Sequence, residues 1–134
     1  MTDPVPVTPP APPPTVFIVD DDEAVRDSLA AMVEVAGLPV EVFDSALAFL
    51  HRCPQDRPGC LVMDLRMPGM DGLALLGVVK QRHAGVRFVM LTAVTDPDHV
   101  RQAAHLKVDG YMAKPFSRQT LLDTLTKLRA AETR

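Results

Sequence analysis

The stretch VFIVDDDE, residues 16–23, joins a short run of apolar residues to a run of acids. Four consecutive apolar residues, Val16 to Val19, are typical of a strand that is buried on both of its faces. The same arrangement returns at residues 60–64, where CLVM precedes Asp64, and a third apolar run, FVML, occupies residues 88–91. These runs indicate the strands of a parallel sheet.

Helical patterns alternate with the strands. Apolar residues recur at intervals of three and four after each run, and further short strands are expected at residues 39–43 and 110–113. Asp22, then Asp44 or Ser45, and finally Ser117 are candidate helix caps, and Gly37 is expected to end the first helix. Five strands that alternate with five helices predict an α/β fold with helices on both faces of the sheet.

The composition separates a tail from this domain. Seven of the 13 prolines lie in residues 1–15, which we expect to form a disordered, proline-rich tail before a folded domain at residues 16–131. The net charge of −3 disfavours direct binding to nucleic acid, and no apolar run approaches the roughly 18 residues of a membrane span. Cys53 and Cys60 are too few for a disulfide scaffold, so they are expected to be inert thiols in a cytoplasmic protein.

Polar residues follow four of the five predicted strands. Asp20 and Asp21 follow the first strand, and Asp64, Thr92 and Lys114 end three later ones. Because the carboxyl ends of parallel strands meet at one edge of the sheet, these side chains are expected to surround one crevice. Clustered carboxylates repel one another unless a cation such as Mg²⁺ binds them, and a hydroxyl and an ammonium group can contact phosphoryl oxygens. The set therefore predicts phosphoryl transfer, with one acid as the nucleophile.

Four motifs carry a resemblance to a known family: VFIVDDDE at residues 16–23, MDLRMPGMDG at 63–72, LTA at 91–93 and DGYMAKPF at 109–116. From about Thr15 to Leu128 the chain resembles the receiver domain of two-component response regulators, in pattern most like the receivers of helix-turn-helix regulators. The resemblance implies a flavodoxin-like, doubly wound sheet of five parallel strands in the order 2-1-3-4-5, with five helices, as in chemotaxis regulators.

The resemblance also assigns roles to individual residues. Asp64 matches the aspartate that accepts a phosphoryl group from a histidine kinase or a histidine phosphotransfer protein. Asp20, Asp21, Asp64 and the main-chain carbonyl of Arg66 match the Mg²⁺ ligands, and Lys114 matches a lysine of the catalytic site.

Thr92 and Tyr111 match the pair of switch residues, of which Thr92 also contacts the phosphoryl group. The switch is expected to act on the face made by the fourth helix, the fifth strand and the fifth helix, which would bind a downstream protein or a second copy of the chain. The chain departs from the family at Lys107, where receivers usually carry glycine, and Pro97 is expected to stiffen the segment after the fourth strand. Pro115 is expected to follow a cis peptide bond.

The alternatives concern what the domain is attached to and which chemistry it performs. The chain is either a stand-alone receiver or the receiver half of a DNA-binding transcription factor whose output domain lies outside it. We expect no enzymatic activity beyond its own phosphorylation and dephosphorylation. A phosphohydrolase with Asp20 as nucleophile and Asp22 as general acid is disfavoured, because Asp64 would have no role. The four histidines, His51, His83, His99 and His105, lack ligand spacing and are expected to be exposed.

Overall fold

The computed structural model describes residues 15–54, 57–64, 66–67, 70–83, 85–93, 101, 108–114 and 117–132. Its main sheet has five strands in the order β2-β1-β3-β6-β7, and every neighbouring pair is parallel. The bounds of the strands are β1 Thr15–Val19, β2 Val40–Phe43, β3 Gly59–Asp64, β6 Val86–Ala93 and β7 Gly110–Lys114. The predicted order 2-1-3-4-5 is therefore confirmed.

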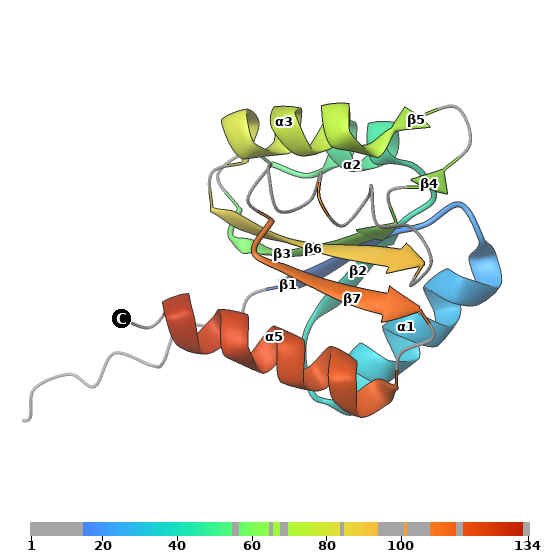
Figure 1. Ribbon diagram of the computed structural model, residues 1–134, viewed down its shortest axis with the longest axis vertical. Helices are drawn as coiled ribbons and strands as arrows, with labels where there is room; N and C mark the ends of the chain where they lie inside the picture. The colour runs from blue at the N-terminus through green and yellow to red at the C-terminus, as the bar shows by residue number, and fades with distance from the viewer. Residues whose placement is uncertain are drawn as a thin grey trace, which may run out of the picture.

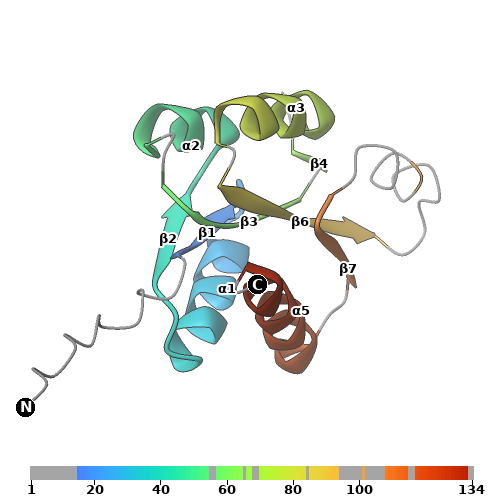
Figure 2. The ribbon, with the colours of Figure 1, turned by 90° about the vertical axis from the view of Figure 1, so that its left-hand side faces the viewer.

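Helices cover both faces of this sheet, as Figure 2 shows: α2 and α3 lie on one face, and α1 and α5 on the other. Their bounds are α1 Glu23–Val35, α2 Ala46–Arg52, α3 Gly72–Arg82 and α5 Arg118–Glu132. The predicted fourth helix, between residues 97 and 106, lies outside the described residues except for Arg101. The expectations for the tail, Lys107 and Pro115 also fall outside them.

The helix ends follow from local hydrogen bonds. Asp22 Oδ1 accepts from the amide of Ala24 at 2.9 Å, which satisfies a donor that the first turn of α1 leaves unpaired. Gly37 follows the end of α1 with φ of 80°, a conformation that glycine adopts without a Cβ clash. Ser45, rather than Asp44, caps α2, because its Oγ accepts from the amide of Ala48 at 3.0 Å.

The core consists of one apolar cluster on each side of the sheet. Phe17, Phe43 and Phe49 pack on the side of α2 and α3, with ring centroids 5.4–6.3 Å apart. On the other side, Ile18 and Val62 pack with residues of α1 and α5: Leu29, Val33, Leu121 and Leu125. Alternate residues of β1 therefore enter different clusters, as a strand buried on both faces requires.

One prediction about a histidine is wrong. His83 is fully buried, its Nε2 lies 3.2 Å from the main-chain carbonyl of Cys53, and its ring centroid lies 5.2 Å from that of Phe49. His83 directly follows α3, and its contacts with Phe49 of α2 and with Cys53, the residue after α2, bury the ring between these segments. His51 is exposed as expected, and the other two histidines lie outside the described residues.

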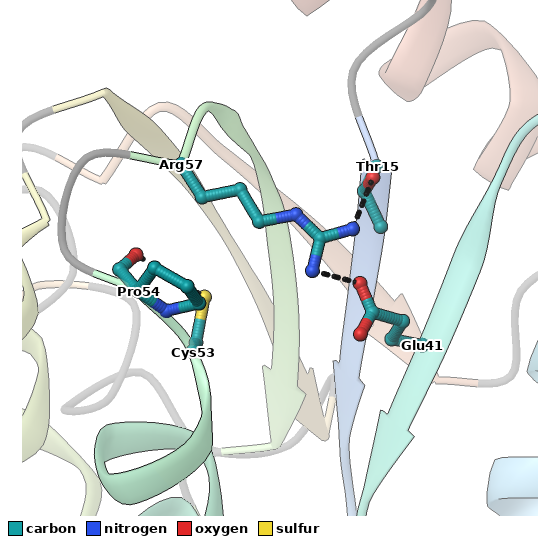
Figure 3. Close-up of polar contacts among 5 residues, drawn as sticks. All are labelled: Thr15, Glu41, Cys53, Pro54 and Arg57. Atoms are coloured by element: carbon teal, nitrogen blue, oxygen red, sulfur yellow. Dashed lines mark hydrogen bonds and ion pairs between the residues drawn. The ribbon is translucent and has the colours of Figure 1, made fainter.

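Arg57 joins the amino ends of three strands (Figure 3). It precedes β3, and its guanidinium donates to Thr15 Oγ1 of β1 at 3.2 Å and forms an ion pair with Glu41 of β2. The guanidinium carbon also lies 5.3 Å from the ring centroid of Phe17. The ion pair is partly exposed and contributes only about 0–1 kcal/mol, so the main effect of Arg57 is to fix the position of the segment before β3.

Both cysteines are free and buried, in line with the prediction of inert thiols. Burial raises the pKa of the Cys53 thiol, and the positive charge of Arg57 opposes that rise in part. Within the described part of the chain, no helix is long and apolar enough to cross a membrane.

Candidate functional site

The register of the sheet brings Asp20 and Asp64 to the same level. Val19 of β1 pairs with Met63 of β3, so the next residues along the two strands, Asp20 and Asp64, lie side by side at the carboxyl ends. Neighbouring strands are about 4.8 Å apart, and both residues therefore border one end of the sheet. In Figure 1 this is the side on which the arrows of β6 and β7 end and β1 leads into α1.

The main chain of Thr92 and Lys114 continues this edge. Asp64 pairs with Leu91 of β6, so Thr92 lies one residue beyond the level of Asp64. Lys114 is the last residue of β7 and pairs with Ala93, one residue further along β6. The register thus places the backbone positions of all the strand-end residues singled out from the sequence along one edge, in the order that the strand order dictates.

The three consecutive acids after β1 occupy different environments. Asp20 is buried, with 4% of its surface exposed, whereas Asp21 and Asp22 are exposed. Asp22 Oδ1 accepts from the amides of Ala24 and Val25 at 2.9 and 3.3 Å, so this carboxylate serves as the cap of α1. The cap role expected for Asp22 is confirmed, and Asp20 and Asp21 are the two acids of this run that are predicted to bind a cation.

Asp20 is held by hydrogen bonds on its main chain and its side chain. Its amide donates to the carbonyl of Phe43 at 3.2 Å, and its Oδ1 accepts from the amide of Asp22 at 2.9 Å. Its carbonyl accepts from Arg26 Nη1 of α1 at 2.7 Å. The bond to Oδ1 offsets part of the cost of burying this carboxylate, which is large when the group has no partners.

Arg26 lies near this edge among the described residues, and sequence reasoning missed it. A basic residue in the first turns of a helix is unfavourable to the helix dipole, and Arg26 follows an acidic run at residues 20–23. This unfavourable placement could have indicated that Arg26 makes a specific contact. Its target, a main-chain carbonyl, is not visible in any residue pattern.

The donor atoms at this edge suit a hard cation, but they do not form a closed cage. Among the residues whose side chains the structure describes, no three His, Cys, Asp or Glu side chains come together as a metal site. The described carboxylates, from Asp20, Asp21 and half-buried Asp64, supply only oxygen donors. Mg²⁺ binds to a few carboxylates, keeps several waters and needs no cage of protein ligands, so the donor set fits this ion.

A short antiparallel ribbon follows β3. Its strands are β4 Arg66–Met67 and β5 Met70–Asp71. Arg66 pairs with Asp71 and Met67 with Met70. Arg66 begins β4 two residues after Asp64, and its main-chain carbonyl is the one that is expected to act as a Mg²⁺ ligand.

Tyr111 lies on β7, beside Met90 of β6. Its side chain is 56% exposed, whereas its neighbour Met112 is buried against α1 and α5.

Comparisons with known proteins agree with this geometry. The profile of the family described as "Response regulator receiver domain" matches residues 16–126. The chain belongs to the response regulator receiver domain family. Members of this family signal through phosphorylation, and the motifs quoted above all lie within the matched residues.

Individual relatives show the extent of this similarity. The receiver is 36% identical over 118 residues to the transcriptional regulatory protein FixJ of Bradyrhizobium diazoefficiens, covering 87% of this chain and 58% of that protein. It is 39% identical over 101 residues to the DNA-binding transcriptional regulator NtrC of Escherichia coli, covering 75% of this chain and 22% of NtrC.

Among solved structures, the chemotaxis protein CheY4 of Vibrio cholerae superposes with a TM-score of 0.76 at 27% identity, covering 85% of the receiver and 97% of CheY4. The receiver therefore corresponds to nearly the whole of a chemotaxis regulator, but to only 58% or less of the two transcriptional regulators.

Proposed function

We propose that this receiver accepts a phosphoryl group on Asp64 in a magnesium-dependent reaction. The observation that carries the proposal is the register between β1 and β3, which sets Asp64 beside Asp20 at the carboxyl edge of the sheet. A carboxylate oxygen of Asp64 attacks phosphorus, the bond from phosphorus to the imidazole nitrogen of a phosphohistidine breaks, and an acyl phosphate forms on Asp64. The departing imidazole takes up a proton.

The residues around Asp64 would make this transfer possible. Asp20, Asp21, Asp64 and the main-chain carbonyl of Arg66 would hold Mg²⁺, which neutralises charge on the transferred group. Lys114 would neutralise a second phosphoryl oxygen, and Thr92 would donate a hydrogen bond to a third. Asp20 is kept in place for this role by the hydrogen bonds to its main chain and its carboxylate.

Phosphorylation would then change the surface around β7. As Thr92 moves toward the phosphoryl group, exposed Tyr111 turns inward, and the face made by the fourth helix, β7 and α5 changes shape. That face would bind a downstream protein or a second copy of the receiver. Family members are phosphorylated by histidine kinases, and a kinase or a histidine phosphotransfer protein is the donor proposed here.

The receiver is either a stand-alone protein or part of a longer regulator. A stand-alone receiver at residues 16–131, with a proline-rich tail at 1–15, would relay the phosphoryl group or bind a target directly in the cytoplasm, where free buried thiols persist. The similarity to transcriptional regulators that are longer than the matched region supports the second answer, in which the receiver controls a DNA-binding output domain. Binding of the full native gene product to promoter DNA would distinguish the two.

The proposal is tested by labelling with a small phosphodonor. Incubation with acetyl phosphate and Mg²⁺ is expected to add one acid-labile phosphoryl group, detected by intact-protein mass spectrometry, and Asp64→Asn is expected to abolish it. Asp27→Asn, which changes an exposed carboxylate of α1, is the matched control and should be labelled like the unaltered receiver. An acid-labile label that persists on Asp64→Asn would refute the assignment.

A further inference from the structure

Arg26 links α1 to the acidic edge through the main chain. Its Nη1 donates to the carbonyl oxygen of Asp20 at 2.7 Å, a length expected for a strong, charge-assisted bond. The side chain is only partly exposed, and its own amide donates to the carbonyl of Asp22 at 3.0 Å as the first bond of the helix. Arg26 is therefore fixed to the helix at one end and to the site at the other.

We propose that Arg26 is a positioning residue that sets the orientation of Asp20 and Asp21 toward the phosphoacceptor. This inference rests on the proposed function, because it concerns the presentation of the same acidic pair. The side chain acts through its bond to the main-chain carbonyl of Asp20, in the peptide group that joins the two acids.

The hydrogen bonds around Asp20 explain why one contact has this effect. The amide of Asp20 donates to the carbonyl of Phe43 of β2, and the carbonyl of Asp20 accepts from Arg26 of α1, so the peptide groups on both sides of Asp20 are held by other elements. That peptide group, whose oxygen Arg26 binds, carries the amide of Asp21 and sets the direction in which Asp21 leaves the strand. With the bond in place, the carboxylate of Asp20 also meets the amide of Asp22 at 2.9 Å. Removal of Arg26 takes away the bond from α1 to this peptide, so we expect the two acids to be oriented less firmly.

A purely electrostatic role for Arg26 makes the opposite prediction. A guanidinium next to the acidic pair repels a divalent cation, so deleting its charge would by itself strengthen Mg²⁺ binding. Loss of positioning weakens Mg²⁺ binding instead, because partners that orient ligands are typically worth 10–100-fold in metal affinity. The direction of the change therefore separates the two roles.

The experiment compares Arg26→Met with Arg82→Met. Methionine keeps an unbranched apolar stem and a similar helix propensity, and it removes only the guanidinium. Arg82 is an exposed residue at the end of α3, at the opposite end of the sheet, and controls for the change in net charge. Mg²⁺ affinity is measured by calorimetric titration, and exchange of the Asp22 amide is measured by NMR on the metal-free receiver.

We expect Arg26→Met to bind Mg²⁺ about tenfold more weakly and to exchange the Asp22 amide faster, while Arg82→Met matches the unaltered receiver. Unchanged or tighter Mg²⁺ binding by Arg26→Met would overturn the inference, even if the variant were less stable. If the unaltered receiver neither binds Mg²⁺ nor takes label from acetyl phosphate, the proposed function fails. The Asp22 amide then decides the positioning role alone, and an unchanged exchange rate overturns it.

Discussion

The start of β3 provides a test in which one chemical change has opposite effects at two positions. At Gly59, an added Cβ would lie 2.5 Å from the carbonyl oxygen of Thr15 and would overlap the ring of Phe17. The obstructing carbonyl belongs to the main chain of β1, and the ring is fully buried, so neither can move aside cheaply. At Gly77, in α3, nothing lies within 4 Å of an added Cβ.

These surroundings set the expected magnitudes. Overpacking in a filled core costs about 1–3 kcal/mol, and the overlap with two fixed groups places Gly59→Ala near the upper end of that range. Gly77→Ala is expected to stabilise the receiver by about 0.5–1 kcal/mol, because alanine loses less backbone entropy than glycine in a helix. The two variants should therefore differ by about 3–4 kcal/mol, although each adds one methyl group.

The assay is urea unfolding followed by far-ultraviolet circular dichroism, since the chain has no tryptophan for fluorescence. The midpoint is expected to fall for Gly59→Ala and to rise for Gly77→Ala, with the slope unchanged for both. If Gly59→Ala unfolded at the same urea concentration as the unaltered receiver, the close packing of β1 against β3 derived above would be incorrect.

Two further results are expected. Asp22→Ala should lower the free energy of unfolding by about 1 kcal/mol through loss of the α1 cap, yet retain acetyl phosphate labelling of Asp64; loss of labelling would show that Asp22 belongs to the site. Because burial raises the pKa of the Cys53 thiol, the unfolded chain loses this proton first, so Cys53 contributes stability below about pH 9 that is lost as the pH rises further. Between pH 8 and 10 the free energy of unfolding should therefore fall more steeply for the unaltered receiver than for Cys53→Ala. Equal slopes against pH would contradict the burial effect.

Much of this architecture was predictable because the sheet is buried on both faces. Apolar runs such as Val16–Val19 have few alternatives to a central strand, and the ends of β1 and β3 were recognisable from the first polar residues, Asp20 and Asp64. The caps Asp22 and Ser117 were recognisable for a similar reason, since a short side-chain oxygen before an amphipathic segment satisfies amides that the helix cannot.

The rest depends on contacts between segments that are distant along the chain. The burial of His83 could not be predicted, because it depends on the carbonyl of Cys53, which follows α2 and lies 30 residues earlier in the chain. The ribbon of β4 and β5 has no alternating apolar pattern to indicate it. Arg26 was missed because its acceptor is a main-chain atom, and sequence patterns describe side chains. The different environments of Asp20, Asp21 and Asp22 likewise follow from the path of the backbone after β1.

The bracket of Arg57, Thr15 and Glu41 has a practical consequence for work with this receiver. It fastens the amino ends of β1 and β2, whereas Asp64, the proposed phosphoacceptor, lies at the carboxyl edge of the sheet. The five residues of β1 span about 16 Å, and that length separates the two edges. A surface anchor or reporter joined directly to Thr15 would lie at the amino edge of the sheet, the length of β1 away from Asp64, where the proposed phosphodonor would approach.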